Sequence, residues 1–132
     1  MYTVTLTERF EATHALDTLR PQPHSHEWVV RIVLMSESLS PPGIVMNYFE
    51  LKPIISKLLP HHKHLNTEYP FAPTGENLAR HFYQTLKPQL PQLHAVSVGE
   101  FEDFMCTFTE NLSHHAAGTS PADGFDGGDC NR

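Results

Sequence analysis

Cysteine, basic residues and long apolar runs are all scarce in this chain of 132 residues. Only Cys106 and Cys130 are present, so the chain by itself can build neither a disulfide framework nor a CxxC zinc site. Nine lysines and arginines stand against fifteen acidic residues, for a formal net charge of -6. Because phosphate affinity comes mainly from clustered Lys and Arg, this balance argues against nucleic-acid partners and anionic membrane surfaces.

No apolar stretch approaches the roughly 18 residues that a membrane-spanning helix needs. The opening MYTVTLTERF also lacks the basic-then-apolar order of a secretion signal. We therefore expect a cytoplasmic protein without a membrane partner. The length suits one domain, which we expect over residues 1–110, because residues 111–132 are small, polar and glycine-rich, as in a flexible tail.

Histidine is abundant, with ten residues, and three of them fall in alternating segments. YTVTLTERFEATHAL (2–16) predicts a strand whose even-numbered residues face the core. His14 lies on that face, where an imidazole needs a partner or a metal to offset its desolvation. HSHEWVVRIVLM (24–35) predicts a second strand, with His24 and His26 in register with its more apolar set.

His24 and His26 lie two residues apart, so on a strand they project from one face with Cβ atoms roughly 6 to 7 Å apart. An antiparallel neighbour carrying His14 would supply a third ligand. Three imidazoles are the complement that leaves a catalytic zinc one open position. The alternative is a satisfied core histidine beside two surface residues, and the matched face parity of the two strands favours the metal.

The remaining segments predict two helices and two further strands. Asn47 begins a helix that Pro53 should bend or delay, residues 60–73 should be irregular, and Thr74 caps a second helix. HAVSVGEF (94–101) and FMCTF (104–108) predict strands. This order favours an α+β fold, an antiparallel sheet with helices on one face, whose open edges oligomerisation would close.

Two more polar groups are candidates for function. HHKHLN (61–66) taken alone is more typical of a solvated loop. Glu100 ends an otherwise apolar strand row. It is either a rim carboxylate that reaches water or a group near imidazoles that takes part in binding or proton transfer.

Six motifs, in order, resemble the 6-pyruvoyltetrahydropterin and 6-carboxytetrahydropterin synthase family. HSH resembles the family's H-G-H and FEATHAL its F-x-A-x-H; the others are GIVMNYFELK, HHKHLN, PTGENLA and VSVGEF. Together they cover nearly the whole chain to about residue 110. The resemblance implies the tunnelling fold, a four-stranded antiparallel sheet with two helices on one face. It also implies assembly through trimers into a homohexameric barrel.

The resemblance assigns roles to individual residues. It implies Zn²⁺ bound by three histidines, a pterin ring anchored by Glu100, and a pocket lined by Thr74. His62 falls on the family's catalytic histidine. The implied zinc ligands are His14, His24 and His26.

The chain departs from the family where protons are transferred. Family synthases carry a cysteine four or six residues before the HxH pair, where this chain has Arg20 and Thr18. His61 replaces the aspartate beside the catalytic histidine, so His61 and His62 are our candidates for proton transfer. We expect Cys106 to be a poor substitute, since six residues of strand would separate it from Glu100 by roughly 20 Å.

The implied activity is that of a zinc-dependent carbon-oxygen lyase acting on dihydroneopterin triphosphate or a related pteridine. Zinc would supply Lewis acidity and a template. Two alternatives stay open: an inactive relative that binds zinc and pterin as a binding or assembly protein, and a metal-assisted hydrolase of another small substrate.

Overall fold

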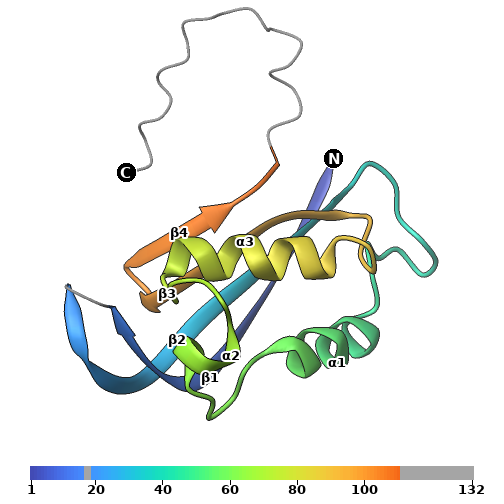
Figure 1. The fold of residues 1–132 in the computed structure, drawn as a ribbon. Helices are drawn as coiled ribbons and strands as arrows, with labels where there is room; N and C mark the ends of the chain where they lie inside the picture. The colour runs from blue at the N-terminus through green and yellow to red at the C-terminus, as the bar shows by residue number, and fades with distance from the viewer. Residues whose placement is uncertain (17–18, 111–132) are drawn as a thin grey trace, which may run out of the picture.

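The structure, a computed structural model, describes residues 1–16 and 19–110. One antiparallel sheet has the strand order β1-β2-β3-β4, and its three helices lie on one face of it (Figure 1). The predicted antiparallel sheet with helices on one face is thereby confirmed. The elements are β1 (Tyr2–Leu16), β2 (Arg20–Ser36), α1 (Tyr48–Leu58), α2 (Leu65–Glu68), α3 (Gly75–Leu86), β3 (Leu93–Phe101) and β4 (Phe104–Phe108).

The period-two pattern of β1 places its apolar side chains as predicted. Leu6, Phe10 and Ala12 are buried, while the odd-numbered neighbours are mostly exposed. Glu8 interrupts the apolar row, and its carboxylate pairs with the ammonium of Lys52 on α1. The ion pair therefore gives the charged group a partner where the strand meets α1.

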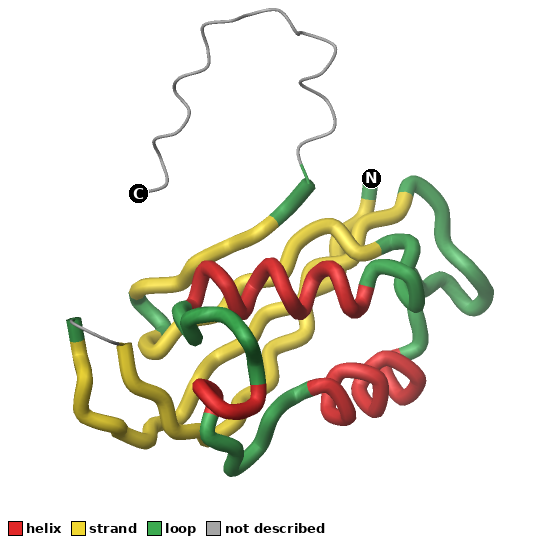
Figure 2. The backbone as a smooth tube through the Cα atoms, viewed as in Figure 1, coloured by secondary structure: helices red, strands yellow, loops and turns green. Residues whose placement is uncertain are grey.

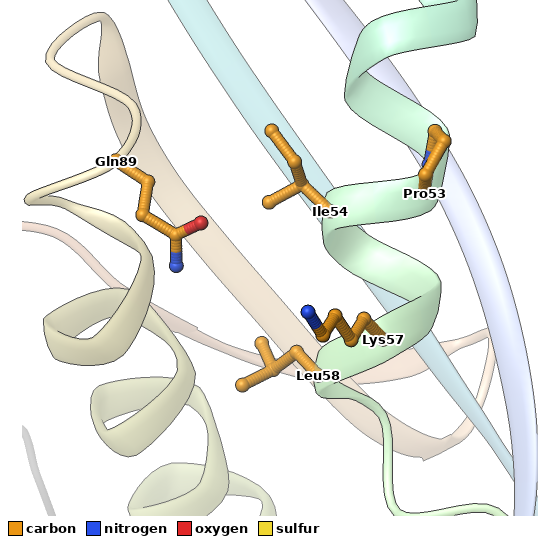
Figure 3. Close-up of a pocket in the computed structure, with 5 residues that line it drawn as sticks. All are labelled: Pro53, Ile54, Lys57, Leu58 and Gln89. Carbon is orange, nitrogen blue, oxygen red and sulfur yellow. The ribbon is translucent and has the colours of Figure 1, made fainter.

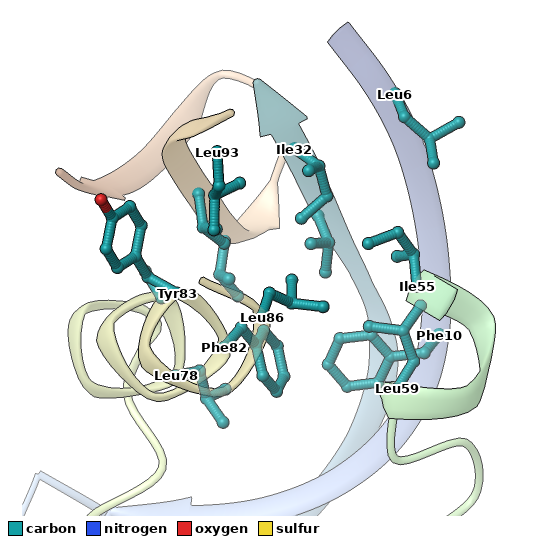
Figure 4. Packing of buried hydrophobic residues seen from close by; sticks show 14 of the residues in the cluster. Leu6, Phe10, Ile32, Ile55, Leu59, Leu78, Phe82, Tyr83, Leu86 and Leu93 are labelled. Atoms are coloured by element: carbon teal, nitrogen blue, oxygen red, sulfur yellow. The ribbon is translucent and has the colours of Figure 1, made fainter. Parts of the chain in front are cut away.

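The core fills the space between the sheet and helices α1 and α3 (Figure 4). On α3, Leu78, Phe82 and Leu86 recur every four residues and are fully buried against the sheet. This is the 3.6-residue periodicity of a helix with one apolar face. The sheet supplies the facing layer, which includes Phe10 and Ile32.

Two details of the helices differ from the sequence prediction. A third helix, α2, occupies part of the segment expected to be irregular, because Leu65 is fully buried and anchors this short turn. Helix α1 begins directly after its cap at Asn47, so its start is not delayed, and the alternative of a bend at Pro53 stays a prediction. Burial of Leu51 and Ile55 holds α1 together across the exposed proline. Figure 2 follows the chain through α1, α2 and α3 over the same face.

The sheet of a single chain stays open, with β1 and β4 as its outer strands. A barrel would therefore require association of several chains, and the predicted hexamer stays a prediction. No helix in the described part of the chain is both long and apolar enough to cross a membrane. The predicted flexible tail, residues 111–132, lies outside the described residues.

Candidate metal centre

The register of β1 and β2 brings the three predicted histidines together. His14 is the cross-strand partner of His24, and Ala12 is that of His26. The Nε2 atom of His14 lies 2.9 Å from that of His24 and 3.3 Å from that of His26. An antiparallel pairing with matched face parity therefore produces the imidazole cluster that the sequence suggested.

Glu100 joins this cluster from β3. Its two carboxylate oxygens lie 3.3 Å from His14 Nε2 and 3.6 Å from His26 Nε2. Each of the four side chains has one donor atom within 4.8 Å of all the others. The Glu100 side chain is 22% exposed, so the carboxylate lies among the imidazoles rather than extending freely into water.

Backbone carbonyls determine which ring nitrogen carries the proton. His14 Nδ1 lies 2.9 Å from the carbonyl oxygen of Pro73. The Nδ1 atoms of His24 and His26 lie 3.3 Å from backbone carbonyl oxygens as well. A carbonyl oxygen can only accept, so each Nδ1–H donates and each Nε2 is directed toward the other rings. Such outer contacts are the usual support of metal-binding histidines.

Burial keeps His14 neutral. Its side chain is fully buried, and this desolvation lowers the pKa of the imidazole below its ordinary value. The hydrogen bond to Pro73 and the charge of Glu100 raise the pKa of His14, but burial outweighs them. The indole of Trp28 packs against His14 on one side, with ring centroids 4.8 Å apart. A neutral, fixed imidazole is the form that binds a metal.

The donor set fits a divalent cation. With the Nδ1 atom of each ring beside a backbone carbonyl, three Nε2 atoms and a carboxylate face one another. A cation at the centre would be attracted by all four donor groups. Imidazole nitrogen and carboxylate oxygen are also a usual ligand combination for zinc. His14, His24, His26 and Glu100 are thus able to hold such an ion.

A cavity of about 240 Å³ adjoins the cluster at Glu100. Thr74, the predicted pocket residue, lines it, and its hydroxyl also caps α3 by accepting from the Asn77 N–H at 3.1 Å. Glu76 and Cys106 line the same cavity, although sequence reasoning had assigned neither to it. For Glu76 a signal was present, because it lies in the PTGENLA motif two residues after Thr74.

Cys106 is closer to Glu100 than expected. The chain reverses after Phe101, so β4 runs back along β3 and pairs Cys106 with Val98. The predicted separation of roughly 20 Å is therefore wrong, since it counted six residues of extended strand across the turn between the two predicted strands. The start of α3 packs closely on this hairpin, and a Cβ on Gly75 would meet the Cys106 sulfur at 2.9 Å.

The Cys106 thiol is nevertheless a weak nucleophile. Burial raises the pKa of the thiol to about 11, and the negative charges of Glu76 and Glu100 act in the same direction. An ordinary cysteine has a pKa of about 8.5. The thiol is therefore protonated at neutral pH, which differs from the reactive thiolate of catalytic cysteines.

We predict slow alkylation of Cys106. In a Cys130→Ser background, iodoacetamide at about pH 8 should react with the folded protein on the order of 10²-fold more slowly than with the denatured protein, because the thiolate fraction falls with the raised pKa. The rate should then rise steadily toward pH 10. Mass spectrometry follows the reaction, and fast labelling of the folded chain would show that the thiol is ionised.

His61 and His62 lie on the loop before α2, beside β1. The His62 N–H donates to the Glu11 carbonyl at 2.6 Å, and the Thr13 N–H donates to the Lys63 carbonyl at 3.0 Å. His62 has a φ of 60°, a left-handed conformation that histidine adopts more readily than most residues. Both histidines are exposed. Within residues 1–16 and 19–110, neither belongs to the metal-donor group, so their catalytic role stays a prediction.

A larger cavity, of about 470 Å³, lies between α1 and the segment after α3 (Figure 3). Its lining consists of Pro53, Ile54, Lys57, Leu58 and Gln89. Those residues include no histidine, cysteine or carboxylate. This cavity therefore lacks the donor atoms that the smaller one beside Glu100 provides.

Comparisons with known proteins agree with the geometry. The sequence model of the family described as 6-pyruvoyl tetrahydropterin synthase matches residues 3–111. The fold is similar to the 6-pyruvoyl tetrahydropterin synthase of Caenorhabditis elegans, with a TM-score of 0.72 and 22% identity over 83% of this chain and 96% of that chain. No curated protein matches in sequence.

Two further solved structures are similar in fold. An uncharacterized protein from Wolinella succinogenes has a TM-score of 0.67 and 16% identity, over 83% of this chain and 98% of that chain. The 6-pyruvoyl tetrahydropterin synthase of Plasmodium falciparum has a TM-score of 0.65 and 14% identity, over 84% of this chain and 98% of that chain. At such identities the likeness concerns the fold.

Proposed function

Because this chain belongs to the 6-pyruvoyl tetrahydropterin synthase family, we propose that it is a zinc-dependent carbon-oxygen lyase acting on dihydroneopterin triphosphate or a related pteridine. The observation that supports this proposal most is the cluster of three imidazole nitrogens and one carboxylate beside a cavity of about 240 Å³. Candidate metal ligands and a cavity therefore lie side by side within the family's fold.

Each proposed residue has a distinct task. His14, His24 and His26 bind the ion, which when bound supplies Lewis acidity toward the hydroxylated side chain of the pterin. Thr74 and Glu100 line the cavity in which we propose that the pterin ring binds. His62 and His61 are the proposed proton carriers, and their loop is hydrogen-bonded to the strand that carries His14.

We also propose assembly as a homohexamer, a dimer of trimers, in the cytoplasm. The open edges at β1 and β4 support an assembly, because unpaired strand edges are usually covered or paired. Neighbouring chains would then complete the walls of the cavity beside the exposed rings of Phe101 and Phe104.

The second candidate is an inactive relative that retains zinc and pterin binding. The absence of the family's cysteine favours this inactive candidate, because Arg20 occupies one of the two positions at which family members carry that residue. Cys106 does not compensate, since burial raises its pKa to about 11. General-base loss typically costs about 10² to 10⁴ in rate, which is compatible with either weak activity or none.

Incubation of the zinc-loaded protein with dihydroneopterin triphosphate separates the two candidates. Release of triphosphate together with a new pterin, identified by mass spectrometry, is the result that we expect for the lyase. Tight binding with no turnover would leave the inactive relative. If the protein neither binds nor converts the compound, both candidates fail.

A further inference from the structure

We propose that Asn66 is a positioning residue, which holds the loop of His62 at a fixed place beside β1. The inference rests on the proposed function, because it presupposes that His62 transfers a proton. Asn66 is the last residue of the motif HHKHLN (61–66) and is neither a proposed metal ligand nor a proposed proton carrier. Its carboxamide forms two hydrogen bonds with the backbone of the strand that carries His14.

The loop that carries His62 runs alongside the end of β1 in the parallel direction. The His62 N–H donates to the Glu11 carbonyl at 2.6 Å, and the Thr13 N–H donates to the Lys63 carbonyl at 3.0 Å. Thr13 also forms a parallel bridge with His64. The loop therefore pairs with the outer edge of β1, as a short additional strand would.

The Asn66 side chain continues this pairing where the backbone cannot. From Leu65 the chain turns into α2, so its peptide groups no longer run extended along β1. The Ala15 N–H donates to Asn66 Oδ1 at 2.8 Å, and Asn66 Nδ2 donates to the Ala15 carbonyl at 3.0 Å. A carboxamide offers an acceptor oxygen and N–H donors, as a peptide group does, so it can replace a backbone partner.

These two hydrogen bonds restrict the position of His62. The His62 side chain is exposed, so packing against the core does not fix the loop at this residue. Without the carboxamide, the backbone bonds at Glu11 and Thr13 would remain, but the loop would open more easily at its end next to α2. A misplacement of about 1 Å can cost about 10²-fold in rate, so small movements of this loop matter for proton transfer.

The metal ligand next to Ala15 has support of its own. His14 is fully buried, is the cross-strand partner of His24, and has its Nδ1 atom 2.9 Å from the Pro73 carbonyl oxygen. These contacts do not involve the Asn66 side chain. Loss of the carboxamide should therefore lower the rate of turnover and leave the zinc content unchanged.

Asn66→Ala and Asn66→Asp test the proposal. Aspartate has nearly the shape of asparagine, but it places an oxygen against the Ala15 carbonyl and cannot form both hydrogen bonds. We expect both variants to lower kcat for dihydroneopterin triphosphate on the order of 10- to 10²-fold, with KM and zinc content unchanged. Amide hydrogen exchange, followed by NMR, should become faster at Ala15 in Asn66→Ala. Thr67→Ala, the matched control at an exposed neighbour in α2, should change neither kcat nor this exchange rate.

A double substitution separates an effect through His62 from a general loss of stability. Adding Asn66→Ala to His62→Asn should lower kcat no further, because a positioning residue has no effect once the group that it positions is absent. Three results would each overturn the positioning role and leave the proposed function intact: unchanged kcat in both Asn66 variants, unchanged exchange at Ala15, or a further loss of kcat in the double variant. Absence of turnover in the unmodified protein would overturn both.

Discussion

Replacement of His24 by alanine should lower bound zinc from about one ion per chain to nearly none, because it removes one of the three imidazole ligands and leaves no donor atom in its place. Turnover should disappear with the metal. His24 is only half-buried, so the fold should tolerate the change better than it would at the fully buried His14. Metal content per chain after dialysis, determined by atomic emission, checks the result.

His94→Ala is the matched control for that prediction. His94 is an exposed histidine on β3 and is not one of the four clustered donors. It should retain zinc at the level of the unmodified protein. Equal zinc content in His24→Ala and His94→Ala would mean that the ion, if any, binds elsewhere.

His62→Asn should reduce turnover by about 10² to 10⁴ without loss of zinc, the usual cost of removing a general base. Asparagine suits this position, because His62 has a φ of 60° and Asn adopts left-handed backbone conformations readily. The Glu11 carbonyl would still receive its hydrogen bond from the backbone N–H. Steady-state rates and zinc content, measured on the same preparation, check the prediction.

His61→Asn provides the comparison for His62. The ring of His61 lies edge-on to Phe10, with centroids 6.4 Å apart. If His62 transfers the proton, His61→Asn should lower turnover much less. A large loss of turnover in His61→Asn alone would indicate that His61, and not His62, is the general base. Unchanged rates in both variants would show that neither histidine transfers a proton in the reaction.

Local patterns in the sequence predicted the strands and the histidine cluster well. The period-two alternation of β1 and β2 determines which residues face the core, so His14, His24 and His26 could be placed on one face. The 3.6-residue periodicity of the apolar residues from Leu78 to Leu86 predicted α3. Such features depend on neighbours within a few residues, which a sequence displays directly.

Features that depend on contacts between distant segments were harder to predict. The hairpin of β3 and β4 was predicted, but its register, which pairs Cys106 with Val98 and so places Cys106 beside the cavity, was not. The approach of Glu100 to the imidazoles depends on the register of β2 with β3. Likewise, α2 forms because Leu65 is buried and α2 packs against β1. The polar composition of residues 60–73 gave no sign of this contact in the sequence.

The most direct measurement is a crystal structure of the zinc-loaded protein with anomalous scattering recorded at the zinc absorption edge. We predict one peak per chain, bonded at about 2.0 to 2.1 Å to the Nε2 atoms of His14, His24 and His26. A peak at other residues, or the three rings separated with no ion between them, would contradict the metal centre and leave only the shared fold.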